Sequence, residues 1–231
     1  MVYPLPVDLI RKFAEQVDTL YVVEELDDIF ESHCKKHGIE VLQFERIRRQ
    51  EGLDAMRAIR PDLYVTAAFG QILSQKLLDI PKIGTVNVHP SLLPKYRGPA
   101  PVNWSIIEGE TRTGVTTMMT DAGMDTGDIL LVRETELSPD EDAAMLSERL
   151  ARVGAELLVE TLRRIEAGDC PRRPQDNEAA SYFPMLTKET GRIDWTRGAR
   201  RVVNLVRGVV PWPGAWTEFG EGVLKIWKAS P

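Results

Sequence analysis

Apolar runs and amphipathic segments alternate along the first half of the chain. The runs at 19–23, 39–42, 63–68, 84–88, 115–120 and 129–134 predict strands, because they are short and apolar. The segments at 8–16, 25–37, 52–59, 71–78 and 101–108 predict helices. This order is typical of βαβ units. It predicts the α/β class, with a mainly parallel sheet and helices on both of its faces.

The most regular helical pattern follows residue 138. Its apolar positions recur at helical spacing, at Leu146, Leu150, Val153, Leu157, Leu158, Leu162 and Ile165. Ser138-Pro139-Asp140-Glu141 has the form of a capping box with proline at the first helical position, and Gly168 suits the end of a helix. We therefore expect a long helix from Ser138 to Gly168 that serves as scaffold.

The pattern changes beyond residue 168. Residues 169–188 are polar and contain prolines, which indicates an extended connection, and residues 199–207 predict a short amphipathic helix. Residues 215–219 and 223–228 flank a Gly-Glu-Gly turn and predict a β-hairpin. Because an isolated hairpin is only marginally stable, we expect it to be the truncated start of a second, all-β domain.

Composition and charge narrow the classes of function. The 231 residues are 43% hydrophobic, enough for a sizeable core, and the net charge of -6 argues against bulk binding of nucleic acid. From residue 188 onward, however, eight basic side chains oppose four acidic ones, which fits either a contact with a polyanion or an ordinary solvated face. The two cysteines are far apart, and no secretory signal or run near the ~20 apolar residues of a membrane span is present. We expect a cytoplasmic protein with reduced thiols and no membrane partner.

The strand at 84–88 leads into the residues with the clearest chemical potential. Asn87 and His89 are two positions apart, so they point to the same side of a strand, at the sheet edge where α/β proteins bind ligands. The later loop D-A-G-M-D-T-G-D offers three carboxylates, Asp121, Asp125 and Asp128, although such residues also form ordinary turns. An amide that donates to an oxyanion, an imidazole and an orienting carboxylate suit acyl-type transfer between two bound substrates. A nearby carboxylate would also favour the charged form of His89.

Other kinds of site find less support. The sequence has neither a dinucleotide-binding fingerprint nor a P-loop, and Ser91 lacks the context of a catalytic serine. His33 and His37 are spaced to share one face of a helix beside Cys34, but no third metal ligand is evident, so we expect no metal site.

The segments N-V-H-P-S-L-L-P-K-Y-R-G-P-A-P and D-A-G-M-D-T-G-D-I-L resemble the folate-dependent formyltransferases. Within that family, the later segments A-S-Y-F-P-M-L-T-K-E-T-G-R-I-D-W, N-L-V-R-G, P-W-P-G-A-W and L-K-I-W-K-A are similar to the branch that acts on methionyl-tRNA. The resemblance covers about residues 42–231. It implies a Rossmann-like doubly wound formyltransferase fold, followed by the start of a C-terminal OB-like β-barrel. It also implies transfer of a formyl group from 10-formyltetrahydrofolate, the co-substrate, to the amino group of initiator methionyl-tRNA.

The resemblance also implies roles for individual residues. Asn87, His89 and Asp125 match the catalytic trio of the family. The positions that match its folate-binding segments are Phe69, Gly70, Gln71, Ile72, Leu73, Ser91, Leu92, Leu93, Pro94, Ala122, Gly123 and Met124.

The resemblance implies four regions. These are an atypical segment at 1–41, a catalytic domain at 42–188, a linker helix at 189–208 and the start of the barrel at 209–231. The atypical segment, Y-P-L-P-V-D-L-I-R-K-F-A and V-V-E-E-L-D, is instead similar to part of indolepyruvate:ferredoxin oxidoreductase. It lacks the usual opening strand, the G-T-P loop and the basic insertion that grips tRNA, so we expect weakened tRNA binding. For the oligomeric state, a monomer is the favoured expectation.

Two alternatives stay open. H-P-S and Asn103-Trp104 are also similar to formyltransferases that act on amino sugar nucleotides. The atypical first segment and the truncated barrel would also suit an inactive folate-binding remnant.

Overall fold

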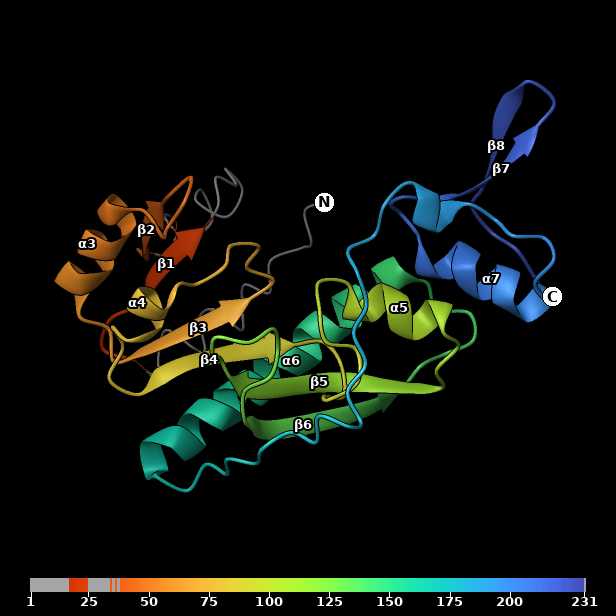
Figure 1. Ribbon diagram of the computed structural model, residues 1–231. Helices are drawn as coiled ribbons and strands as arrows, with labels where there is room; N and C mark the ends of the chain where they lie inside the picture. The colour runs from red at the N-terminus through yellow and green to blue at the C-terminus, as the bar shows by residue number, and fades with distance from the viewer. Residues whose placement is uncertain (1–16, 25–33, 35, 37, 231) are drawn as a thin grey trace.

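The computed structural model of this chain describes residues 17–24, 34, 36 and 38–230 (Figure 1). Its elements are, in order, β1 Tyr21–Glu24, β2 Glu40–Gln43, α3 Gln50–Ile59, β3 Leu63–Ala67, α4 Gln75–Leu78, β4 Gly84–His89, α5 Pro101–Ile107, β5 Arg112–Met119, β6 Ile129–Glu136, α6 Ala143–Ala167, η1 Glu189–Gly191, α7 Ala199–Gly208, β7 Ala215–Phe219 and β8 Gly222–Ile226. The helix expected at 8–16, most of the one expected at 25–37, and both His33 and His37 lie outside the described residues.

The α/β class predicted from the sequence is confirmed, and the sheets are mixed in direction. Strands β3 and β4 run parallel, whereas β4–β5 and β5–β6 are antiparallel, in the order β3-β4-β5-β6. Strands β1 and β2 form a separate parallel pair. Strand–helix alternation stops after α5. Because β5 and β6 are joined directly by a loop, without the long crossover that a parallel pair needs, they pair antiparallel.

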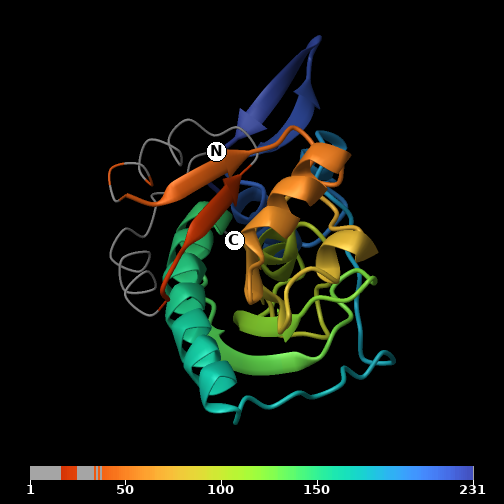
Figure 2. The ribbon, with the colours of Figure 1, turned by 90° about the vertical axis from the view of Figure 1, so that its left-hand side faces the viewer.

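Helix α6 covers one face of the four-stranded sheet (Figure 2). Its buried residues Leu146, Leu150 and Leu157 pack with Val115 of β5 and with α5. Helix and sheet approach closely at Gly154, where an added Cβ would lie 2.9 Å from Val88 Cγ1. The expected scaffold helix is therefore present, and it holds β4 and β5 from behind.

The capping box predicted at Ser138 is wrong. The N-cap of α6 is Asp142, whose carboxylate accepts a hydrogen bond from the Met145 N–H at 2.9 Å. Glu141 instead forms a two-point ion pair with Arg149, at 2.7 and 2.8 Å. A buried carboxylate held by a guanidinium is not available to cap a helix, and the helix begins one turn later. The predicted end at Gly168 is correct, with φ +73°.

The helix predicted at 71–78 is shorter than expected and covers only 75–78. The Gln71 side chain accepts a hydrogen bond from the Ile47 N–H at 2.8 Å and donates one to the Phe44 carbonyl at 3.1 Å. These bonds tie the segment after β3 to the segment after β2. Residues 71–74 are therefore not helical, because a tertiary contact outweighs their local helical preference.

The C-terminal part packs around α5. Residues 169–188 run along β6 and then beside α5, as an extended connection, in agreement with the sequence (Figure 1). Helix α7 and the following turn bury Val206 and Val209 with Ile107 at the end of α5. The predicted hairpin is confirmed as β7–β8, and it projects away from the rest of the molecule (Figure 2).

Candidate active site

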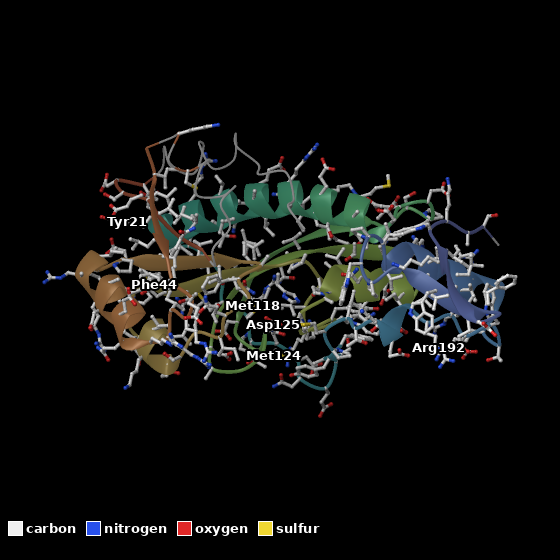
Figure 3. All side chains as sticks on the ribbon, turned by 90° about the horizontal axis from the view of Figure 1, so that it is seen from above. Tyr21, Phe44, Met118, Met124, Asp125 and Arg192 are labelled. Carbon is white, nitrogen blue, oxygen red and sulfur yellow. The ribbon has the colours of Figure 1, made fainter. Side chains whose placement is uncertain are left out.

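Asn87 and His89 lie on the face of β4 that points away from α6. Val88 packs with α6, so the alternation of a strand places Asn87 and His89 on the opposite face. On that face Asn87 pairs in register with Thr66 of β3 and with Met118 of β5. Figure 3 shows Met118, Met124 and Asp125 together on this side. The two polar residues thus share a face at the carboxyl end of β4, as predicted.

Thr66 orients the Asn87 amide. The Thr66 hydroxyl donates a hydrogen bond to Asn87 Oδ1 at 3.0 Å. Since this bond uses the amide oxygen, the NH2 group of Asn87 is directed away from Thr66. The half-buried side chain therefore presents a donor, which is what an oxyanion requires.

His89 is buried, with 4% of its surface exposed, and each ring nitrogen faces a different partner. Nε2 lies 2.9 Å from the Tyr96 carbonyl, and Nδ1 lies 3.8 Å from Asp125 Oδ1. A carbonyl only accepts, so Nε2 carries the proton. In the neutral ring, Nδ1 is then a free acceptor that faces the carboxylate.

Burial governs the charge of His89. Desolvation lowers the pKa of His89 below its usual value of 6.5, and it outweighs the opposing effects of Asp125 and of the Tyr96 carbonyl. Asp125 favours the imidazolium, as expected of a nearby carboxylate, but the cost of burying that charge is larger. The pKa of His89 therefore stays below 6.5, which favours the neutral ring at rest.

Asp125 is the member of the 121–128 loop that reaches His89. Its backbone is left-handed, with φ 54°, and its Oδ2 accepts a hydrogen bond from the Gly98 N–H at 2.8 Å. Asp121 instead orders the loop, since its Oδ1 accepts from the Gly123 N–H and the Thr126 hydroxyl. Of the three candidate carboxylates, the geometry thus singles out Asp125.

Three consecutive residues of the turn after β4 organise the site. The carbonyl of Tyr96 binds His89, and the N–H of Gly98 binds Asp125. Between them, the buried Arg97 side chain binds Gln175, which in turn binds the Asp125 loop. Gly98 has φ +106°, and an added Cβ would lie 2.5 Å from the Phe183 carbonyl oxygen, so this position requires glycine. The turn therefore holds imidazole and carboxylate in fixed relation.

The predicted folate-binding segment 91–94 forms the scaffold of this turn. Ser91 is fully buried and donates to the Lys95 carbonyl, and Leu93 packs with Met118 and Ile129. Leu92 lines a hollow of about 210 Å³ whose lining includes none of the trio. In this structure Ser91, Leu92 and Leu93 thus support the site or face away from it.

Of the other two predicted binding segments, one follows β3 and the other belongs to the Asp125 loop. Among residues 69–73, Phe69 and Leu73 pack against the core under α3, while Ile72 is 77% exposed. Gly70 is exposed and Gln71 is held by the contacts described above. Ala122, Gly123 and Met124 form the exposed tip of the Asp125 loop. Ile72 and Met124 are large apolar side chains left in solvent, which suits contact with a ligand.

Several contributors could not be recognised from the sequence. Thr66 and Gln175 reach the site only through register and a tertiary contact, and neither has a local signal. The same sheet face also buries the hydroxyls of Tyr64, Thr85 and Thr120, which have no hydrogen-bond partner within the described part of the chain. Burial raises the pKa of Tyr64 to about 12, so that phenol is neutral. Their shared face follows from the pairing of Tyr64 with Thr85 and of Thr85 with Thr120.

Within the described ranges, no three His, Cys, Asp or Glu side chains gather as a metal site would require. Across those same residues, no helix combines the length and the apolar character of a bilayer span.

Known protein families match both parts of the chain. The family described as "Formyl transferase" matches residues 13–162, and "Formyl transferase, C-terminal domain" matches residues 185–231. The first match begins inside the 1–41 segment. A methionyl-tRNA formyltransferase of Geobacter metallireducens is 51% identical over 85% of this chain and 63% of its own length. One of Acetivibrio thermocellus is 55% identical over 84% of this chain and 63% of its own. The chain thus spans less than two thirds of the length of these relatives.

Solved structures share the fold at lower identity. An N-formyltransferase from Helicobacter canadensis, in complex with folinic acid and dTDP-3-aminofucose, superposes with a TM-score of 0.76 at 19% identity. It covers 98% of this chain and 84% of its own. HypX from Aquifex aeolicus, in complex with tetrahydrofolic acid, has a TM-score of 0.68 at 21% identity over 87% of this chain and 36% of its own.

Proposed function

This chain belongs to the formyl transferase family, and we propose that it transfers a formyl group from 10-formyltetrahydrofolate to the amino group of initiator methionyl-tRNA. The observation that carries the choice of acceptor is the identity of 51 to 55% with relatives named methionyl-tRNA formyltransferase. The sugar-related structure is only 19% identical, which supports the fold and leaves the acceptor open. The proposed setting is the cytoplasm, where translation begins.

The first step is attack of the acceptor amine on the formyl carbon. The nitrogen lone pair forms the new C–N bond, and the carbonyl electrons move onto oxygen. Asn87 donates its N–H to this oxyanion, because Thr66 already occupies the amide oxygen. Removal of one such donor costs about 10²–10³ in rate.

The second role is proton movement. As the amine attacks, it becomes acidic, and Asp125 accepts its proton directly or through one water. His89 Nδ1 lies 3.8 Å from that carboxylate and is unprotonated at rest, so it receives the proton next. Both N–H groups of the imidazolium then face Tyr96 and Asp125, so the ring stabilises the oxyanion through its positive charge. Collapse of the intermediate breaks its bond to N10 of tetrahydrofolate. The proton held by His89 returns through Asp125 to N10 as that nitrogen leaves, and the ring is neutral again.

The folate co-substrate would lie between the loops at 69–73 and 121–125, above the polar face of β4. The exposed side chains of Ile72 and Met124 would then contact the co-substrate. The segment 91–94 would act through the turn that it builds. In this proposal, catalytic roles fall to Asn87, His89 and Asp125, and binding roles to the two loops.

The tRNA would meet the basic C-terminal part, and we propose that its binding is weaker than in the family. Arg192, Arg197 and Arg201 each pair with a nearby acid there, at 2.9 to 3.6 Å. Paired arginines attract phosphates less strongly than free ones. Titration of tRNA at several salt concentrations, beside a full-length relative, would measure this difference.

The test is a single-turnover formylation assay with 10-formyltetrahydrofolate and two competing acceptors, methionyl-initiator tRNA and a dTDP-amino sugar. We expect formyl transfer to the aminoacyl-tRNA, and its loss by about 10²–10³ in Asn87→Ala. Transfer to the sugar alone would contradict the proposed acceptor. Folate binding without transfer to either acceptor would instead support a non-catalytic remnant.

A further inference from the structure

Arg97 is a buried cation that the proposed chemistry does not use. Only 1% of its surface is exposed. Its guanidinium donates to Gln175 Oε1 at 2.8 and 3.1 Å, to Asn177 Oδ1 at 2.9 Å and to the Tyr182 hydroxyl at 2.6 Å. These partners are neutral amides and a phenol. A buried charge held by neutral groups is costly, so its persistence calls for a reason beyond stability.

Gln175 joins Arg97 to the catalytic loop. Its Oε1 receives the two bonds from Arg97, and its Nε2 donates to the carbonyls of Asp125 at 2.9 Å and Gly127 at 2.7 Å. Both ends of the amide are therefore used. A full positive charge at the oxygen polarises the amide and strengthens both N–H donors.

These donors bind the loop at a residue whose backbone conformation is unfavourable. Asp125 adopts the left-handed region, at φ 54°, which is unfavourable for a residue with a Cβ. Left to itself, the residue would relax toward negative φ and carry its carboxylate away from His89 and Gly98. The two hydrogen bonds from Gln175, to the carbonyl of Asp125 itself and to that of Gly127, oppose this relaxation.

We propose that Arg97 and Gln175 are positioning residues, which hold the Asp125 loop so that its carboxylate faces both His89 Nδ1 and the Gly98 N–H. The pair acts through backbone carbonyls and touches no reacting atom. This role deepens the proposed formyl transfer and, for its kinetic readout, rests on it.

The variant Gln175→Glu distinguishes a positioning role of Gln175 from a contribution to stability alone. A carboxylate keeps the acceptor for Arg97 and adds an ion pair, but it has no N–H for the Asp125 and Gly127 carbonyls. Gln175→Met removes both functions at similar volume, and it serves if the charged variant does not fold. Tyr182→Phe is the matched control, because it deletes a different hydrogen bond of Arg97 at an exposed residue and leaves Gln175 intact.

Three measurements on the full chain are needed. They are kcat and KM for formyl transfer, the melting temperature, and exchange of the Gly98 amide in protein labelled with 15N-glycine. For Gln175→Glu we expect a loss in kcat of about 10- to 100-fold, as for a small displacement of a catalytic group. The Gly98 amide should exchange about tenfold faster, because its carboxylate acceptor moves away, while the melting temperature stays within about 3 °C. Tyr182→Phe should match the parent protein in kcat and in Gly98 exchange.

Distinct outcomes would overturn the proposal. Normal kcat and normal Gly98 protection in Gln175→Glu would show that Gln175 only satisfies Arg97. A loss of kcat with Gly98 protection unchanged would also exclude a role through Asp125. If the parent protein itself transfers no formyl group, the proposed function fails, yet Gly98 exchange still decides whether Gln175 holds the loop.

Discussion

The two faces of strands β4 and β5 differ in character, because one is apolar and packs against α6 whereas the other carries polar side chains. Toward α6, Val88 and Val115 pack with Leu146, Leu150 and Leu157 in a continuous apolar core. On the other face, polar side chains including Asn87, His89, Thr85 and Thr116 are buried or half-buried. The apolar face gains free energy by excluding water, whereas each polar group on the other face must find a partner. Several hydroxyls on the polar face find none among the described residues, which suits a face that binds a ligand rather than one that adds stability.

The largest expected effect lies on the apolar face. Leu150→Ala removes a fully buried side chain from the contact between α6 and the sheet and leaves a cavity. We expect the free energy of unfolding to fall by about 2–5 kcal/mol. Urea denaturation followed by circular dichroism would measure this. Formyl transfer per folded molecule should stay unchanged. A large loss of kcat in fully folded Leu150→Ala would show that the apolar face also contributes to activity.

Asn87→Ala, on the polar face, should lower the rate of formyl transfer and leave stability nearly unchanged. Loss of the amide donor should lower the single-turnover rate by about 10²–10³, or roughly 2.7–4 kcal/mol of transition-state stabilisation. Because Asn87 is half-buried and shares one bond with Thr66, the urea midpoint should change little. Asn87→Asp is a useful comparison, since it keeps the shape but replaces the donor by an acceptor. Full activity in either variant would contradict the assigned role.

A smaller effect should appear in the pH dependence of stability. The pKa of His89 is lower in the folded protein than in the unfolded chain, where it is about 6.5. Below pH 6.5 the unfolded chain therefore binds the proton more readily, so stability declines as the pH falls from 6.5 toward the folded pKa. The decline should be weaker in His89→Gln, as measured by urea titrations between pH 5 and 7.5. An equal decline in both proteins would mean that other groups cause it.

Asp125→Asn tests the contribution of the carboxylate to the pKa of His89. The carboxylate raises the pKa of His89 against the effect of burial, so its removal should lower that pKa further. Histidine NMR titration would follow the ring directly. A rise in the pKa would instead mean that water enters the site in the variant.

The smallest expected effect is an increase in stability. Thr85 is 2% exposed, and its hydroxyl finds no partner among the described residues. Replacement by valine, which has the same shape, should raise the free energy of unfolding by about 1 kcal/mol, since no hydrogen bond is lost. Thr117→Val offers a matched control on the α6 side, because the Thr117 hydroxyl is bonded to Thr161 and its loss should destabilise. A loss of stability in Thr85→Val would show that its hydroxyl is satisfied after all.

Local pattern anticipated most elements and failed where a side-chain contact decided the local structure. The strands, the long helix and the hairpin follow from apolar periodicity, which reflects burial of one face. The start of α6 was placed at Ser138, but the ion pair of Glu141 with Arg149 leaves Asp142 as the cap. Residues 71–74 were expected to be helical, but Gln71 is bonded to the backbone at 44 and 47. The partners of Gln71 lie 24 and 27 residues away, outside a local window. Arg149 is only eight residues from Glu141, but their pairing depends on side-chain geometry that apolar periodicity does not report.

The features of the candidate site also fall into those that local sequence predicts and those that it does not. Spacing alone placed Asn87 and His89 on one face, because the repeat of a strand is two residues. The charge of His89 could not be read from the sequence, since it depends on how completely the folded protein removes water from the ring. The orientation of the Asn87 amide depends likewise on Thr66, a neighbour only through strand register.

By itself, the sequence determined which residues form strands and helices, which face of β4 is polar, and the family to which the chain belongs. These follow from side-chain periodicity and from motifs that are contiguous along the chain. The tertiary structure alone decided which of three aspartates meets the imidazole, what charge that imidazole carries, and how Arg97 and Gln175 hold the loop. Those depend on distance and on exclusion of water, and both arise only when segments far apart in the chain are brought together.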